Sequence, residues 1–163
     1  SGWKTSTSGK TVDVISPIDG SVVGKLPVVT TVEIDEAFVK AKNAQASWEA
    51  TPLNKRVAVM HLAADWTRHM VEYLVALMCR EIGKSVDEAK SEIIRTADLI
   101  DYFDDEVQSM RGETLDSDNF PGYDKGRIAL IERVAHGVVV AIATPVSLLP
   151  VNATMSAPAW LTT

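Results

Sequence analysis

The sequence predicts a mixed α/β fold, and three observations lead to it. Two short β-rich runs flank a turn near the start of the chain. Three segments with helical spacing of apolar residues and clear end signals follow between residues 30 and 112. The run Val138–Ile142 is continuously apolar after Gly137, as in a strand buried on both faces of a parallel sheet. We therefore expect a β-hairpin, three helices, an edge strand and the first strand of an incomplete doubly wound, Rossmann-like sheet.

The hairpin is predicted from Thr11–Ile15 and Ser21–Leu26, which the turn residues of Ser16–Gly20 separate. Pro27 closes the second run because proline has no N–H to donate to a ladder.

The first helix is predicted from a capping box, in which the Thr30 hydroxyl and the Glu33 carboxylate exchange hydrogen bonds with each other's backbone amides. Its apolar face contains Ile34, Ala37, Phe38, Ala41, Gln45 and Trp48.

The second helix is predicted to start with Thr51 as cap and Pro52 in the first helical position. Gly83 ends it. Its apolar face contains Leu53, Val57, Met60, Ala64, Val71, Leu74, Met78 and Ile82.

The third helix opens with a second capping box, Ser85 and Glu88, and ends at Arg111–Gly112. The residues that line its packing face are Ala89, Ile93, Thr96, Leu99 or Ile100, Phe103, Val107 and Met110. The acidic run Asp104–Glu106 is interpreted as a solvated face.

Residues 112–126 are rich in Gly, Asp and Pro and predict a long connection. Arg127–Arg133 alternates in part, like an edge strand. After Val138–Ile142, prolines interrupt an apolar tail that carries no charge. We therefore divide the chain into residues 1–136, with the hairpin, helices and edge strand, and residues 137–163, with the buried strand and tail.

Composition excludes several classes of protein. The chain has 163 residues and a formal net charge of -6, and no basic stripe suggests nucleic acid as a partner. No apolar run approaches the 18 or so residues of a membrane-spanning helix. Cys79 is the single cysteine, so no internal disulfide can form, and a reducing compartment is favoured. The first residues resemble neither a signal nor a transit peptide, and the compartment stays open.

Several segments, in this order, resemble the N-terminal part of the aldehyde dehydrogenase superfamily over residues 11 to 142. They are Ser16–Gly20 with Val23-Gly24 and Pro27, Ile34–Ala37 with Trp48, Thr51-Pro52 with Arg56, Glu81–Lys84, Glu88-Ala89 with Glu92, and Gly137–Ile142. Ile94–Asp98 with Tyr102, and Arg111–Leu115 through Asn119–Gly122, resemble its non-phosphorylating, NADP-dependent branch. That branch oxidises glyceraldehyde 3-phosphate to 3-phosphoglycerate.

Arg95 is the one candidate substrate-binding residue. The resemblance implies that it helps to hold the substrate phosphate, to which a guanidinium offers a planar fork of donors. The alternative is an ion pair with Asp98 or Glu92 on its own helix.

The resemblance also implies a cysteine nucleophile in a Gly-Gln-x-Cys segment and a general base in Glu-Leu-Gly-Gly, and this sequence contains neither. Cys79 lies far upstream of the family's nucleophile, within a helix, and is interpreted as a small packed apolar residue. Near the expected oxyanion asparagine the sequence departs from the family, so neither Ser147 nor Asn152 is assigned. No catalytic residue is therefore assigned.

No cofactor-binding residue is assigned either, because the Lys-Pro segment and the Gly-rich turn that hold NADP in the family are absent. We expect no metal site: His61, His69 and His136 show no grouping with Cys or acids in the sequence, and His61 is interpreted as a packed histidine.

Three functions follow as hypotheses. In the first, the chain is a shortened, catalytically inactive relative that serves as a structural or interaction subunit, with other protein chains covering Val138–Ile142 and the tail. In the second, it is the N-terminal part of a complete NADP-dependent enzyme. A third, a phosphometabolite-binding module, would depend on Arg95.

Overall fold

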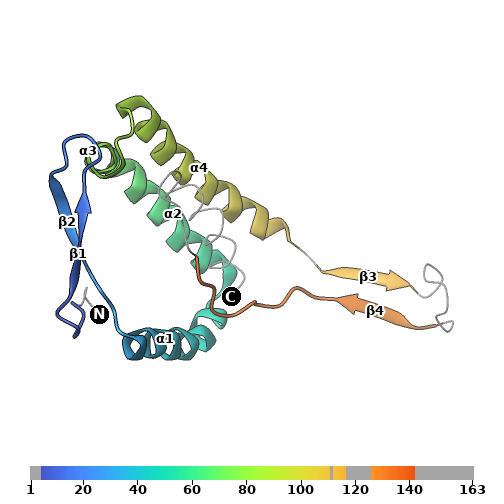
Figure 1. Ribbon diagram of the computed structural model, residues 1–163. Coiled ribbons are helices and arrows are strands. Elements are labelled where there is room, and N and C mark those ends of the chain that lie inside the picture. Colours follow the sequence, from blue (N-terminus) through green and yellow to red (C-terminus); the bar gives the residue numbers. More distant parts are fainter. Residues whose placement is uncertain (1–4, 111, 117–125, 142–163) are drawn as a thin grey trace.

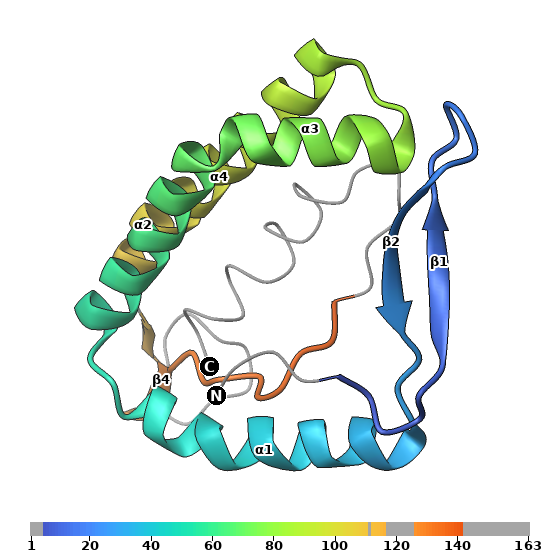
Figure 2. The same cartoon turned by 90° about the vertical axis from the view of Figure 1, so that its left-hand side faces the viewer.

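The computed structural model describes residues 5–110, 112–116 and 126–141 (Figure 1). In chain order the elements are β1 (Thr11–Ile15), β2 (Val22–Pro27), α1 (Thr31–Glu49), α2 (Leu53–His69), α3 (Val71–Ile82), α4 (Val86–Ser109), β3 (Glu113–Asp116) and β4 (Ile128–Ile131). In Figure 2, α2 and α4 lie along one side, the β1–β2 hairpin along the opposite side and α1 along a third.

The predicted hairpin is confirmed. β1 and β2 pair antiparallel, with Thr11 opposite Pro27 and an irregularity between Val14 and Ile15. The turn closes where the Ser16 amide donates to the Ser21 carbonyl at 2.8 Å. Gly20 has a φ of 72°, which only glycine adopts without steric cost.

The first capping box is also confirmed. The Thr30 hydroxyl accepts from the Glu33 amide, and the Glu33 carboxylate accepts from the Thr30 amide at 2.7 Å. The same carboxylate accepts from Ser6 and Thr7, so it ties the N-terminal segment to the start of α1. These hydrogen bonds lower the pKa of Glu33 to about 2, and the bond from the Thr30 amide has the largest effect.

The apolar face predicted for α1 does not lie in a core. None of its residues is buried, and Ile34 and Phe38 are 44% and 45% exposed. α1 packs too little against α2–α4 to bury this face, although its spacing is that of an amphipathic helix.

The second predicted helix is in fact two helices, so the described residues contain four helices rather than three. The helical path breaks at Met70, whose ψ of 8° departs from α-helical geometry. Neither glycine nor proline marks the break. It turns α3 so that its apolar side reaches the start of α4, an effect of packing that local propensity does not reveal.

The predicted cap of that helix is wrong by one residue and in its chemistry. The helix begins at Leu53, after Pro52. The Thr51 hydroxyl instead donates to the Ser47 carbonyl at the end of α1. At α4, Ser85 caps the helix by accepting from the Glu88 amide, but the predicted capping box is incomplete: the Glu88 carboxylate accepts from the Ser85 hydroxyl instead of the Ser85 amide.

The core lies where α4 packs on α2 and α3. One cluster joins Val75 and Met78 of α3 to Ala89 and Ile93 of α4. A second joins Val57 of α2 to Val107 of α4 and is completed by Leu53, Met60 and Phe103. Burying one side chain as large as Ile93 contributes about 1.5–3 kcal/mol. α4 is therefore the element around which the helices assemble.

β3 and β4 form a second antiparallel pair, which projects away from the helices (Figure 1). β4 confirms the predicted edge strand. β3 was not predicted, because Glu113–Asp116 lies in the segment interpreted as a connection. A Cβ at Gly112 would lie 2.4 Å from the Ile131 carbonyl oxygen. The backbone at residue 112 can therefore approach the end of β4 this closely only with a glycine.

The predicted buried strand Val138–Ile142 is not found in the described part of the chain. Residues 138–141 pair with no other described strand, and Val138, Val139 and Val140 are 40%, 47% and 55% exposed. A strand needs a neighbouring backbone to satisfy its amides and carbonyls, and no described segment supplies one. Ile142 and the tail lie outside the described residues, and the boundary at residue 136 stays a prediction.

Candidate functional site: a histidine–carboxylate cluster between α2 and α4

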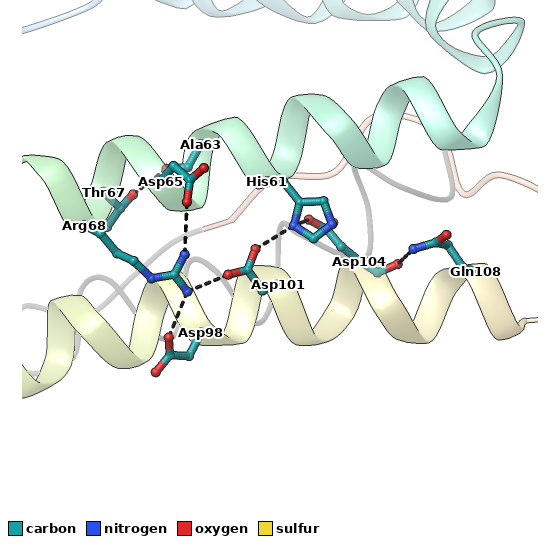
Figure 3. Close-up of polar contacts among 9 residues, drawn as sticks. All are labelled: His61, Ala63, Asp65, Thr67, Arg68, Asp98, Asp101, Asp104 and Gln108. Atoms are coloured by element: carbon teal, nitrogen blue, oxygen red, sulfur yellow. Dashed lines mark hydrogen bonds and ion pairs between the residues drawn. The ribbon is translucent and has the colours of Figure 1, made fainter.

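Charged side chains from two helices meet in one cluster (Figure 3). Asp98, Asp101 and Asp104 follow one another at intervals of three residues and therefore share a face of α4. His61 and Arg68, two turns apart on α2, face them. Because Arg68 meets Asp98 while His61 meets Asp104, the two helices run antiparallel.

His61 is the centre of the cluster. Its Nδ1 lies 2.7 Å from Asp101 Oδ1 and 3.5 Å from Asp104 Oδ2. The hydrogen bond with Asp101 raises the pKa of His61, against an opposing effect of burial. The side chain is half-exposed and bound to Asp101, which corrects the interpretation of His61 as a packed histidine on an apolar helix face.

Arg68 links two of the acids. Its Nη2 donates to Asp98 Oδ1 at 2.9 Å and to Asp101 Oδ2 at 2.5 Å, and these bonds raise the pKa of Arg68. Burial raises the pKa of Asp101, but the hydrogen bonds from His61 and Arg68 outweigh it, and the net shift is downward. Asp101 is thus held in place on both sides, with Oδ1 at His61 and Oδ2 at Arg68.

Asp104 is the unusual member of the cluster. Its exposed fraction is 0%, and neither carboxylate oxygen has a hydrogen-bond partner. Burial raises the pKa of Asp104 to about 6. The acidic run Asp104–Glu106 is therefore only partly a solvated face: Asp105 and Glu106 are exposed, whereas Asp104 points toward α2.

The expectation that no histidine groups with acids is wrong as well. The acids lie about 40 residues beyond His61, so only the packing of α2 on α4 brings them together. The sequence did contain one sign of the cluster: Asp98, Asp101 and Asp104 lie three residues apart and so share a helix face. Interpreting residues 104–106 as a solvated acidic run obscured it. His69 contacts the edge of Trp66 instead, and His136 is exposed.

Arg95 is exposed on α4, outside the cluster. A local ion pair of Arg95 with Asp98 or Glu92 is not found in the described residues, where Asp98 binds Arg68 and Glu92 binds Lys84. The substrate-phosphate role that the resemblance implies for Arg95 stays a prediction.

The sheets of the described residues differ from the sheet of a dinucleotide-binding domain. Both sheets in this part of the chain are two-stranded and antiparallel, whereas a dinucleotide crevice forms where parallel strands lead into helix N-termini. Cys79 packs against the cluster of Val75 and Ile93, as interpreted from the sequence. Ser147 and Asn152 lie outside the described residues. No described helix is long and apolar enough to cross a membrane.

The class of protein follows from family comparison and fold together. The model of the "Aldehyde dehydrogenase family" matches residues 3–161, so the chain belongs to the aldehyde dehydrogenase family. The mixed α/β class predicted from the sequence is confirmed, since aldehyde dehydrogenases of this fold superpose on the whole chain.

Within this family, the chain is similar to NADP-dependent glyceraldehyde-3-phosphate dehydrogenases. The chain is 37% identical over 156 residues to an NADP-dependent glyceraldehyde-3-phosphate dehydrogenase of Arabidopsis thaliana, covering 94% of this chain and 31% of the relative. A Streptococcus equinus enzyme of the same name is 33% identical, over 86% of this chain and 29% of its own length. The NADP complex of the Bacillus halodurans enzyme superposes with a TM-score of 0.93 at 34% identity, over 99% of this chain and 34% of that one. The chain thus spans about a third of the length of these relatives.

Proposed function

We propose that this chain acts as a structural and interaction unit of a larger assembly in the aldehyde dehydrogenase family and does not turn over an aldehyde with its own residues. The exposed run Val138–Val140 carries the proposal. β4 adds the exposed Ile128 and Leu130 to the apolar surface. Exposed apolar segments with free backbone groups are typical of surfaces that another polypeptide covers.

The chemistry of the residues supports the second half of the proposal. The sequence holds neither a Gly-Gln-x-Cys nor a Glu-Leu-Gly-Gly segment. Its single cysteine, Cys79, is partly buried and packs against apolar side chains of α3 and α4.

The test is to purify the native protein together with whatever it binds, and to measure both its intact mass and its activity. We expect the polypeptide that contains these residues to purify in a stable complex with other chains. The isolated 163-residue chain should give no NADPH from glyceraldehyde 3-phosphate and NADP. Turnover by the isolated chain, or a monomer without partners, would contradict the proposal.

A second candidate function is the NADP-dependent oxidation of glyceraldehyde 3-phosphate to 3-phosphoglycerate by a longer polypeptide that includes these residues. The identity to the Arabidopsis thaliana enzyme favours it. The remainder of the same polypeptide would then cover Val138–Val140. A mass of the single polypeptide severalfold above 17.7 kDa, measured under denaturing conditions, supports this candidate over the first.

Arg95 provides a narrower test of phosphate recognition. Its exposed guanidinium, with Asp98 and Glu92 bound elsewhere, is available to a phosphate. If it binds the substrate phosphate, Arg95→Ala should weaken glyceraldehyde-3-phosphate binding at least tenfold in calorimetry. Arg80→Ala, which removes an exposed arginine from α3, is the matched control and should leave binding unchanged.

A further inference from the structure

We propose that His61, Asp101 and Asp104 form a three-ligand site for a first-row divalent cation of the zinc type, which joins α2 to α4. This site is independent of the proposed function and of the aldehyde chemistry of the family. His61 comes from α2, and the two carboxylates come from successive turns of α4 (Figure 3).

The positions of the ligand atoms fit a single ion. One oxygen of each carboxylate and one ring nitrogen of His61 lie within 4.8 Å of one another. Nδ1 of His61 is 2.7 Å from Asp101 Oδ1 and 3.5 Å from Asp104 Oδ2. Two ligand atoms bound tetrahedrally to one zinc ion lie about 3.3 Å apart, so shifts of less than about 1 Å at the two measured separations suffice.

Asp104 supplies an independent reason for a ligand. It is fully buried, it points into the cluster, and both of its oxygens lack a hydrogen-bond partner. A buried carboxylate without partners is costly, and such groups are normally paired or bound to a metal. A cation between Asp104 and His61 would satisfy it.

Arg68 supports the site from outside. It binds Oδ2 of Asp101 and leaves Oδ1 turned toward His61, which is the arrangement of an outer residue that orients a ligating carboxylate. The side chains of His61 and Asp101 are 42% and 31% exposed, so an ion can reach the site from solvent and a water can complete its coordination.

The donor set selects the kind of cation. One imidazole with two carboxylates suits zinc(II), cobalt(II) or nickel(II). Calcium and magnesium require more oxygen donors than the cluster offers. The two carboxylates and a neutral imidazole together balance the charge of one divalent ion.

The experiment uses the complete 163-residue chain, stripped with a chelator and titrated with cobalt(II) and zinc(II). We expect one equivalent of cobalt(II) to bind and to give visible d–d absorption, with zinc(II) displacing it. Asp104→Asn and His61→Gln should each weaken binding at least tenfold. Asp105→Asn, an exposed neighbour with the same change of charge, should bind as the unsubstituted chain does.

Thermal unfolding gives a second readout. Zinc(II) should raise the Tm of the unsubstituted chain and of Asp105→Asn, and leave those of Asp104→Asn and His61→Gln unchanged. Circular dichroism verifies that each variant retains its helices. Absence of stoichiometric binding, or equal binding by Asp104→Asn and Asp105→Asn, would overturn the proposal and leave His61 and Asp101 as a hydrogen-bonded pair only.

Discussion

At the interface of α2 and α4, two neighbouring aspartates differ in burial. Asp104 and Asp105 are adjacent and chemically identical, yet one is fully buried and the other exposed. Burial also raises the pKa of Asp104 to about 6. At neutral pH its charge therefore opposes folding of the metal-free chain.

The first prediction is that Asp104→Asn stabilises the metal-free chain at pH 7 by about 1–3 kcal/mol, because it removes a buried charge that has no hydrogen-bond partner. The free energy of unfolding is measured by urea denaturation in the presence of a chelator. Asp105→Asn is the control, and we expect a change within about 0.5 kcal/mol. A less stable Asp104→Asn would show that the carboxylate has a stabilising partner after all.

At the scale of the element, end signals decide where helices start and stop. Thr30 with Glu33 opens α1, and Gly83 ends α3 with a φ of 71°. Both ends also contact other parts of the chain. Glu33 binds Ser6 and Thr7, and Gly83 approaches the hairpin turn at Pro17. Each end signal is thus also a tertiary contact.

The second prediction concerns the pH dependence of the α1 cap. The folded pKa of Glu33 is about 2, below its ordinary value of 4.5, so its carboxylate favours folding above pH 4.5. That contribution is lost as the pH falls from about 4.5 through 2. Glu33→Gln should flatten the stability curve in this window.

The measurement is the free energy of unfolding between pH 2 and 5. Glu36→Gln, an exposed acid one turn further along α1, is the control and should retain the slope of the unsubstituted chain. Equal curves for Glu33→Gln and the unsubstituted chain would contradict the role of the cap.

The third prediction is that Gly83→Ala destabilises the chain by about 1–2 kcal/mol, since an L-residue is strained at this φ. The added Cβ would also lie 3.1 Å from Cγ of Pro17 and press on the hairpin turn. Gly24→Ala is the control: it has no positive φ and no atom within 4 Å of the new Cβ, so its Tm should change little. Equal Tm values for the two variants would rule out the strain.

At the scale of the whole molecule, much apolar surface is left exposed. α1 buries none of its residues, and Val138–Val140 face solvent. In the described residues, both core clusters lie where α4 contacts α2 and α3. This exposed apolar surface is the observation behind our proposal that further polypeptide covers it.

The fourth prediction is that Val140→Asp reduces association of the chain with its partners or with itself at least tenfold, because a charge in a covered apolar surface loses its hydration. Analytical ultracentrifugation and co-purification measure the effect. Val86→Asp is the matched control: Val86 is exposed at the first position of α4, where an acid is favourable. If both variants associate equally, Val138–Val140 is not the covered surface.

Local chemistry in the sequence alone determined the hairpin, the caps at Thr30 and Ser85, the stop at Gly83 and the edge strand at Ile128–Ile131. These features depend on the geometry of a few consecutive residues, which turn and cap residues encode directly. The ordered family segments likewise determined membership of the aldehyde dehydrogenase family.

Only the tertiary structure decided the break at Met70, the pairing of Glu113–Asp116, the exposure of α1 and the burial of Asp104. Val138–Ala141 shows the same limit, since an apolar run becomes a strand only beside another strand. The cluster of His61 with Asp101 and Asp104 joins residues some 40 positions apart. Such features depend on which surfaces come into contact when the helices pack, and no local sequence pattern specifies those contacts.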